Sequence, residues 1–169
     1  MNRLPAKPTC RKLAVLLFLF LPLGACGMYL DNLILSSPVE GQILDHRRPV
    51  PGLTLERSLM WNVEQRPRLD YAITGDDGRF TFPEVRASYD FGWLSKYLHQ
   101  PTVSQSIYVK TPERDLLAFA NTRSSYRPMA ETGFPVVSMV CDLKTVNPIN
   151  EVVWKLACVL EKKGAFGRE

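Results

Sequence analysis

Apolar and polar residues alternate along most of the chain after residue 38, which is the pattern of strands that bury one face. The alternating runs are short and end at Gly, Pro or Asp residues, which favour turns. These runs, together with short continuous apolar runs, predict strands at 39–45, 53–57, 69–74, 79–82, 103–109, 116–121, 135–143 and 152–160. We therefore expect a mainly β protein, a single antiparallel β-sandwich of about seven strands.

The segments between these runs are predicted to be turns and loops. Residues 45–49 and 75–78 are expected to form tight turns, 111–115 to join a hairpin, and 124–133 to form a polar loop. Residues 90–99 are rich in aromatic residues and end before Pro101, which favours a short helix or an aromatic loop.

The N-terminal segment differs in character from the rest of the chain. Its apolar run 13–23 follows a basic stretch that ends at Lys12. This run is too short to cross a hydrocarbon core, which takes about 20 helical residues. The order of basic, apolar and small residues is typical of a secretory signal. An ordinary signal peptide and a short membrane anchor are both consistent with this order.

The end of this segment, Leu23-Gly24-Ala25-Cys26, resembles the lipobox of bacterial lipoproteins. The resemblance implies that the Cys26 thiol carries a lipid, which anchors the protein to a membrane. It divides the chain into a signal peptide (1–25, removed), a lipid-bearing tether (26–38), the β-sandwich domain (39–160) and a frayed tail (161–169). Gly27 stands where enterobacterial inner-membrane lipoproteins have Asp, which favours the outer membrane of the cell envelope, facing the periplasm. An apolar patch after Cys26 permits a first strand as an alternative to a plain tether.

The formal charge of +4 arises entirely from the N-terminal segment. Residues 1–25 hold four of the 21 Lys and Arg residues and no acidic residue, so 21 − 4 = 17 basic residues stand against 17 acidic ones in the remainder. A body without net charge argues against a nucleic-acid-binding domain, which neutralises phosphates with clustered Lys and Arg.

The same division of the chain decides how the four cysteines are used. Cys10 lies in the predicted signal peptide and Cys26 is the predicted lipid carrier. Cys141 and Cys158 remain, and two thiols in an oxidising compartment are expected to form a disulfide. The alternative is a pair of buried free thiols.

The alternating region 39–91 resembles the carboxypeptidase-regulatory-like, transthyretin-like β-sandwich. The motif of that family is Gly-x-(Val/Ile)-x-Asp, then Pro-x-x-Gly, then Thr-Asp-x-x-Gly-x-Phe-x-Phe. The matching residues in this chain are Gly41, Ile43, Asp45, Pro49, Gly52, Leu55, Thr74, Asp77, Gly78, Phe80 and Phe82. The chain departs from the motif at Gly75, where the family usually has Asp. The resemblance implies a fold and no particular activity, because the module occurs in many unrelated secreted proteins.

The sequence holds little that indicates catalysis. Its two histidines, His46 and His99, have no second His or Cys at metal-ligand spacing, and no Gly-x-Ser-x-Gly nucleophile motif occurs. The carboxylates of Glu56, Asp70, Asp76 and Asp77 are expected to serve a turn or face solvent, and they are too few for an EF-hand-type calcium loop. We predict no enzymatic site, no cofactor and no metal.

Aromatic and Arg residues in predicted loops are the more informative feature. Trp, Tyr and Arg are the residues that most often anchor protein interfaces. The candidate interface residues are Trp61, Trp93, Tyr97, Tyr126 and Arg127. For Trp61 and Trp93 the alternative is that the ring packs in the core.

These features leave three classes of function. Small lipoproteins with such a sandwich, two late cysteines and no catalytic residues resemble immunity proteins that neutralise envelope-directed toxins, including those of type VI secretion. A rigid disulfide-closed scaffold suits this role because it presents binding loops at low entropic cost. The alternatives are a structural or accessory lipoprotein of an envelope or secretion complex, and an enzyme or carbohydrate binder with scattered site residues. We favour the first, a protein that binds another protein.

Overall fold

The computed structural model of the chain describes residues 28–91, 99–149 and 153–161. The regular structure of these residues is all strand, and no helix occurs among them, which confirms a mainly β protein. The strands are β1 Met28–Ser36, β2 Val39–Asp45, β3 Arg48–Pro49, β4 Thr54–Trp61, β5 Arg68–Ile73, β6 Arg79–Phe82, β7 Val85–Phe91, β8 Val103–Lys110, β9 Asp115–Arg123, β10 Val137–Pro148 and β11 Trp154–Glu161. The predicted signal peptide, Cys26, residues 92–98 of the predicted helix or aromatic loop, and most of the predicted tail lie outside the described residues.

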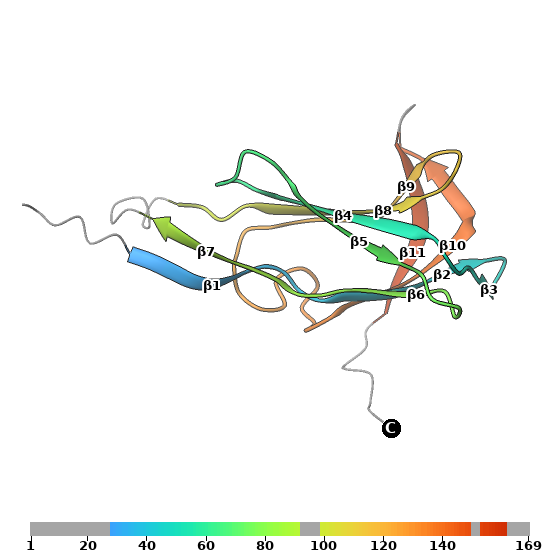
Figure 1. Ribbon diagram of the computed structural model, residues 1–169, viewed down its shortest axis with the longest axis horizontal. Coiled ribbons are helices and arrows are strands. Elements are labelled where there is room, and N and C mark those ends of the chain that lie inside the picture. Colours follow the sequence, from blue (N-terminus) through green and yellow to red (C-terminus); the bar gives the residue numbers. More distant parts are fainter. Residues whose placement is uncertain (1–27, 92–98, 150–152, 162–169) are drawn as a thin grey trace, which may run out of the picture.

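Nine strands form one curled sheet in the order β3-β2-β10-β11-β9-β8-β4-β5, with β6 also paired to β2, while β1 and β7 form a separate two-stranded sheet. Figure 1 shows β4, β5 and β8 lying across from β2 and β6, with β10 and β11 crossing between these two layers at one end. The pairs β2–β10 and β9–β11 are parallel. The sheet is therefore a mixed half-barrel and differs from the purely antiparallel seven-stranded sandwich that we expected. The reason is that β10 and β11 pair with one strand of each layer and so join the layers into a single sheet.

Strand β1 lies within the predicted tether 26–38 and shows that the alternative of a first strand is the one adopted. It pairs antiparallel with β7, so that Met28 lies opposite Phe91 and Ile34 lies opposite Arg86. Residues 33–37 are buried, and Leu35 has no exposed surface. The packed part of the chain thus begins before the predicted domain boundary at Val39.

Two clusters of buried side chains form the core. The larger one lies inside the half-barrel and includes Ile43, Phe82 and Leu156. The smaller one packs β1 and β7 against the ends of β4 and β8, and contains Leu33, Leu35, Leu59, Trp61, Ala87 and Val103. The alternation seen in the sequence produces both clusters, because every second residue of β8 is buried and all four odd-numbered residues of β4 are buried as well.

The pairing of β4 with β8 defines the two ends of the molecule. Trp61 lies opposite Val103 at one end, beside β1 and β7, and Thr54 lies opposite Lys110 at the other end, near β3. We call these the β1 end and the β3 end. The long axis of the molecule in Figure 1 runs between them.

Candidate binding site

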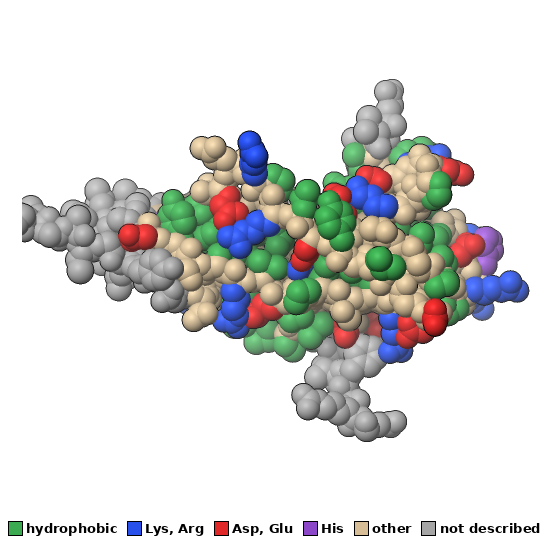
Figure 2. All heavy atoms as spheres, viewed as in Figure 1, with side chains coloured by type: hydrophobic (Ala, Val, Ile, Leu, Met, Phe, Trp, Pro, Cys, Tyr) green, Lys and Arg blue, Asp and Glu red, His purple; other side chains and the backbone are tan. Residues whose placement is uncertain are grey.

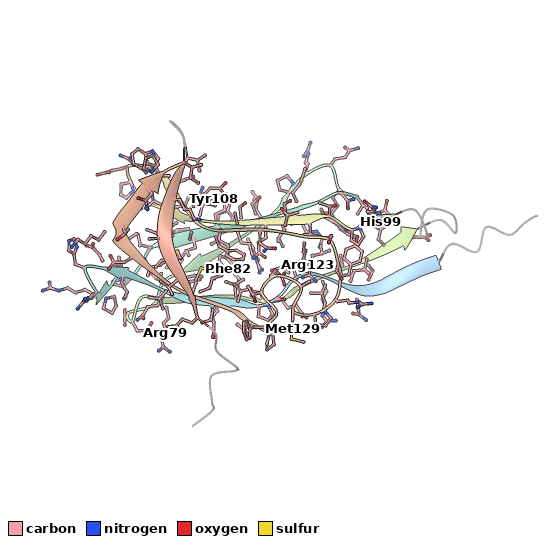
Figure 3. All side chains as sticks on the ribbon, turned by 180° about the vertical axis from the view of Figure 1, so that it is seen from behind. Arg79, Phe82, His99, Tyr108, Arg123 and Met129 are labelled. Atoms are coloured by element: carbon pink, nitrogen blue, oxygen red, sulfur yellow. A yellow bond between two sulfur atoms is a disulfide. The ribbon has the colours of Figure 1, made fainter. Side chains whose placement is uncertain are left out.

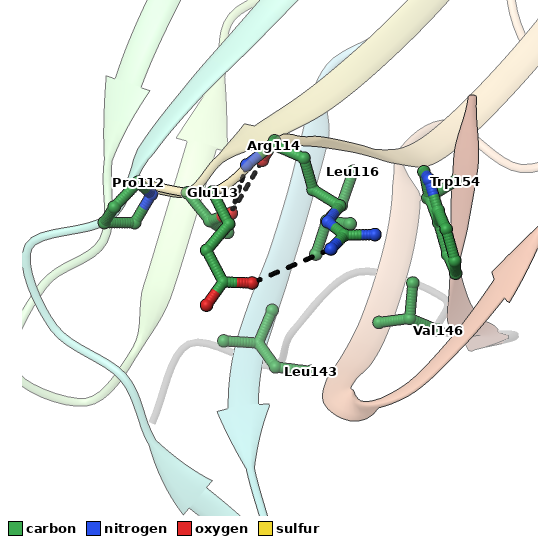
Figure 4. Close-up of a pocket in the computed structure, with 8 residues that line it drawn as sticks. Pro112, Glu113, Arg114, Leu116, Leu143, Val146 and Trp154 are labelled. Carbon is green, nitrogen blue, oxygen red and sulfur yellow. Dashed lines mark hydrogen bonds and ion pairs between the residues drawn. The ribbon is translucent and has the colours of Figure 1, made fainter. Parts of the chain in front are cut away.

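A cleft of about 420 Å³ opens at the β3 end, between the loop that joins β8 to β9 and the strands β10 and β11. Loop residues 111–114 form one side of it. Leu116, Leu143, Val146 and Trp154 form an apolar floor and opposite wall (Figure 4). A concave apolar surface with a few polar groups at its rim is typical of a binding site.

The loop side of the cleft is fixed by its own hydrogen bonds. The Thr111 hydroxyl donates to the Arg114 carbonyl at 2.6 Å and accepts the Arg114 N–H at 3.2 Å, and the Thr111 N–H donates to the same carbonyl. Just before and after this turn, Lys110 Nζ lies 2.6 Å from an Asp115 carboxylate oxygen. The turn therefore places its side chains in a set position over the cleft.

Arg114 and Trp154 meet across the cleft. The centre of the guanidinium lies 4.5 Å from the centroid of the indole ring, a distance at which a cation–π attraction stabilises the pair. Glu113 lies beside them, with one carboxylate oxygen 3.9 Å from Arg114 Nη2. An apolar floor under an Arg–Trp pair suits an apolar or aromatic side chain of a protein partner, because Trp and Arg are frequent anchors of protein interfaces.

An irregularity of β10 opens the cleft. The ladder between β10 and β11 runs in register up to Asp142 and Ala157, and then resumes at Val146 and Leu156. Residues 143–145 are thus extra on the β10 side, and such bulges bend a strand and redirect its side chains. Leu143 and Val146 lie at the two ends of this bulge, which is how both come to line the cleft.

The predicted disulfide is present beside the bulge. Cys141 on β10 and Cys158 on β11 lie opposite one another in the ladder and are bonded, with their Cα atoms 4.1 Å apart. Cys141 is fully buried in the larger core cluster and Cys158 packs against that cluster. The bond therefore links β10 to β11 at the end of the half-barrel that carries the cleft.

Trp61 is not an interface residue in this structure, which corrects one of our predictions. Its side chain is 1% exposed because β4 continues to Trp61 and places it on the inner face. The indole N–H donates to the Tyr126 hydroxyl at 2.8 Å, and the two rings meet edge to face. Trp93 and Tyr97, two other predicted interface residues, lie outside the described residues.

The remaining predicted interface residues, Tyr126 and Arg127, lie on the loop 124–133. Tyr126 is half-buried, whereas Arg127 and the next three residues, 128–130, are exposed. The hydroxyl of Tyr126 also lies 2.7 Å from His99 Nε2, with the two rings stacked. Burial raises the pKa of Tyr126 and lowers the pKa of His99. Figure 3 places His99 near the β1 end, so this surface and the cleft are far apart.

A buried ion pair holds this loop in place. Arg123 and Glu131 are each 2% exposed in their side chains and lie 2.7 Å apart. The Arg123 guanidinium also donates to the carbonyls of Ser125 and Arg127, while Glu131 accepts the Ser37 N–H at 2.9 Å and the Ser37 hydroxyl at 2.6 Å. Burial alone would raise the pKa of Glu131, but these hydrogen bonds and the Arg123 charge outweigh it and leave that pKa below its usual value.

The other candidate residues have structural partners. His46 is exposed in the 45–49 turn, with Nδ1 2.8 Å from an Asp45 oxygen. Asp77 accepts the Arg79 N–H within its turn, which confirms the expected role. Asp70 is different, because it binds the fully buried Arg57 through two hydrogen bonds of 3.0 and 2.5 Å. Among the described residues no group of three or more His, Cys, Asp and Glu side chains is placed to hold a metal ion.

Sequence reasoning missed the cleft and the Arg57–Asp70 pair. Of the two, only the cleft left a usable signal in the sequence. Arg57 continues the inward positions of Leu53 and Leu55, but Asp70 alternates with apolar residues, so the pattern of its own strand placed it on the outer face and did not indicate the pair. Trp154 and Cys158 lie on the same face of β11, so the predicted disulfide already placed the Trp154 ring at the same end of the molecule as the two cysteines.

In the described part of the chain, no helix is both long and apolar enough to cross a membrane. A family model described as a domain of unknown function, DUF6795, matches residues 39–146, which extend from β2 through the bulge of β10. No curated protein matches the chain.

Proposed function

The chain belongs to the DUF6795 family, and we propose that it is a lipid-anchored protein of the bacterial cell envelope that binds another protein. Its most specific form is an immunity protein that neutralises an envelope-directed toxin. The observation that carries the proposal is the cleft at the β3 end, which lies at the far end of the molecule from the first residues of β1.

Anchoring through Cys26 would use that separation. Only Gly27 lies between Cys26 and β1, so a lipid on Cys26 would hold the β1 end at the membrane surface. The cleft and its Arg114–Trp154 pair would then face away from the membrane. This orientation suits a protein that meets an incoming partner and does not require a long flexible linker.

The contacts among motif residues support a relationship to the transthyretin-like module. Gly41 of β2 lies opposite Phe80 of β6, and a Cβ atom on Gly41 would come 2.7 Å from the Phe80 ring. The Gly78 carbonyl accepts the Ile43 N–H at 2.9 Å, and Gly78 has a φ of 70°. Two segments of the motif therefore fit one another across the β2–β6 pair, and each requires Gly for close approach or backbone conformation.

Lipidation is tested by metabolic labelling with a palmitate analogue. We expect the wild type to take up the label and Cys26→Ala to take up none. Cys10→Ala is the matched control, since Cys10 lies in the segment that is removed. Label that survives in Cys26→Ala would refute lipid attachment at this position.

Immunity is tested by competition between siblings. A strain that lacks the gene should be killed by sibling cells that deploy the cognate toxin, and a plasmid copy of the wild type should restore survival. A copy with Trp154→Ala should protect less well, because it removes the ring from the cleft and leaves Arg114 without its stacking partner. Equal survival of the deletion strain and the wild type would refute immunity and favour an accessory role in an envelope complex.

A further inference from the structure

The curled sheet ends at β5, and the hydrogen-bond pattern leaves one row of backbone groups on β5 directed away from β4. The Thr74 N–H donates to the Leu53 carbonyl at 2.9 Å, so Thr74 and Leu53 form a hydrogen-bonded pair in line with the β4–β5 ladder. Residues 68, 70 and 72 therefore pair with β4, because bonded positions recur every second residue. Leu69, Tyr71 and Ile73 direct their N–H and C=O groups to the open edge.

The pairing of β4 with β8 shows independently which residues of β4 bond to β5. The Asn62 N–H donates to the Thr102 carbonyl at 3.0 Å, so the even-numbered residues of β4 bond to β8 and the odd-numbered ones bond to β5. No described strand pairs with the outer edge of β5. The open edge thus offers backbone donors and acceptors at three successive alternate positions.

The side chains at these three positions form an exposed apolar stripe. Leu69 is 50% exposed, Tyr71 60% and Ile73 67%, and none is charged. Natural edge strands are usually protected by charges, Pro residues or bulges. The two charged residues of β5 do not protect this one, because Asp70 binds the buried Arg57 and Arg68 is paired with Glu64. Figure 2 shows apolar side chains over the part of this face where β5 lies.

A groove lies next to the stripe. It has a volume of about 390 Å³ and separates the Tyr71–Ile73 part of β5 from Arg79 and Thr81 of β6. The Ile43–Gly78 hydrogen bond sets the phase of β6 in turn, so that Thr81 also directs its backbone groups away from β2. The seam of the half-barrel therefore has free backbone groups on both of its sides.

We propose that β5 receives an extended strand of the partner protein, which adds to the sheet at its open edge. This inference rests on the proposed function, because it assigns the mode by which the partner binds. The added strand carries uncharged apolar or β-branched side chains at alternate positions, where they meet Leu69, Tyr71 and Ile73 as cross-strand neighbours. Its intervening side chain beside Asp70 is a hydrogen-bond donor, since that carboxylate is 38% exposed.

A second copy of the chain fits this edge less well than a partner strand. A two-fold axis at Tyr71 would pair the two β5 edges antiparallel and reverse the long axis of one copy relative to the other. The two β1 ends would then lie at opposite ends of the dimer. Two chains that are anchored through this end in one membrane cannot adopt that arrangement, whereas a strand of another protein is under no such constraint.

The test selects a phage-displayed library of random nine-residue peptides on the purified full-length chain. We expect enriched peptides with apolar residues at alternate positions. In hydrogen exchange, a synthetic copy of an enriched peptide should protect the amides of Leu69, Tyr71 and Ile73, whereas the amides of residues 70 and 72 are already protected by β4. No enrichment, or protection confined to another part of the chain, would overturn the proposal.

Two substitutions at Tyr71 distinguish the contribution of the backbone N–H to peptide affinity from that of the side chain. Tyr71→Pro removes the outward N–H without removing a bond to β4, so the fold is retained while peptide affinity falls about tenfold. Tyr71→Thr keeps the N–H and should lose less affinity than Tyr71→Pro. Tyr108→Thr on β8, whose two edges are both paired, is the matched control and should bind as the wild type does. Equal binding to the wild type and Tyr71→Pro would overturn strand addition.

Sibling competition separates a failure of this inference from a failure of the proposed function. If the deletion strain is killed and a Tyr71→Pro strain is also killed, strand addition to the toxin is supported. If the deletion strain is killed but Tyr71→Pro protects fully, strand addition is overturned and immunity stands. If the deletion strain survives, immunity is overturned, and the peptide selection alone decides whether β5 accepts a strand.

Discussion

Replacing Glu131 with Gln is expected to destabilise the protein strongly, because it leaves the Arg123 charge buried without a counter-charge. The two side chains are each 2% exposed and lie 2.7 Å apart. Gln preserves the size of Glu131, and its amide oxygen can still accept the Ser37 N–H, while the Ser37 hydroxyl can accept from the amide nitrogen, so the main change is the loss of the negative charge. The effect therefore reports on the charge and not on packing.

The magnitude follows from burial. Removing one partner of a buried ion pair costs about 3–5 kcal/mol, out of a total unfolding free energy of roughly 5–15 kcal/mol for a domain. Urea unfolding followed by tryptophan fluorescence measures the difference. Glu64→Gln is the matched control, because Glu64 pairs with Arg68 at 2.5 Å but the Arg68 and Glu64 side chains are 40% and 27% exposed. That control should lose less than about 1 kcal/mol.

The pH dependence gives a second measurement on the same variant. The folded-state pKa of Glu131 is lower than its unfolded value, so the carboxylate stabilises the fold above the unfolded pKa of about 4.3 and this contribution is lost as the pH falls below it. The wild type should lose stability below about pH 5, and its advantage over Glu131→Gln should shrink. A difference that stays constant from neutral to acidic pH, or a loss as small as that of Glu64→Gln, would show that the Glu131 charge does not stabilise the fold.

Two further predictions concern the frame around the cleft and the seam. Gly78→Ala should lower the unfolding free energy by more than about 2 kcal/mol, because the new Cβ atom would lie 2.5 Å from the Ile43 carbonyl oxygen. Gly52 has a similar positive φ but open space around it, so Gly52→Ala should cost about 1 kcal/mol. Urea unfolding measures both. Replacing Cys141 and Cys158 together with Ala should lower the unfolding free energy by about 3 kcal/mol, given the 17-residue separation, and an unchanged urea midpoint would contradict this.

Alternation located most strands because one face of each strand meets the core. The predicted strands at 39–45 and 79–82 match β2 and β6 residue for residue, and the turn between β5 and β6 has Gly78 at positive φ, as its sequence required. The weakly patterned β7 was not predicted, because β1 and β7 form a small sheet and much of β7 is exposed.

Local pattern did not predict how the strands pair. The parallel register of β2 with β10 joins Val39 to Val137, and nothing in either run distinguishes a parallel neighbour from an antiparallel one. The sandwich prediction failed at this step and not in the identification of strands. Pairing between segments so far apart in the chain is decided by packing of the whole domain.

The misplacement of Trp61 has a single cause that the structure makes plain. The predicted strand ends at Arg57, where a charge interrupts the apolar positions Leu53 and Leu55. Arg57 nevertheless points inward, since its guanidinium binds Asp70 and lies 4.8 Å from the centroid of the Phe82 ring. Because Asp70 neutralises this charge, the alternation continues beyond Arg57, and Leu59 and Trp61 take the following two inward positions. One buried ion pair thus changed a predicted surface residue into a core residue.

The surfaces that remain for recognition are those where strand pairing is interrupted. The cleft exists because residues 143–145 are extra in β10, and the apolar stripe exists because β5 has a partner on one side only. The cleft is built on the larger core cluster, since Leu116 belongs to that cluster and Trp154 packs against it. The side chains of the apolar stripe lie outside that cluster, so the stripe can change at less cost to the fold. Deleting residues 143–145 would remove Leu143 from the cleft, restore a regular β10–β11 ladder and place Val146 directly after Asp142 in it. The cleft would then close while the seam at β5 stayed open, and this difference would show which of the two surfaces the partner needs.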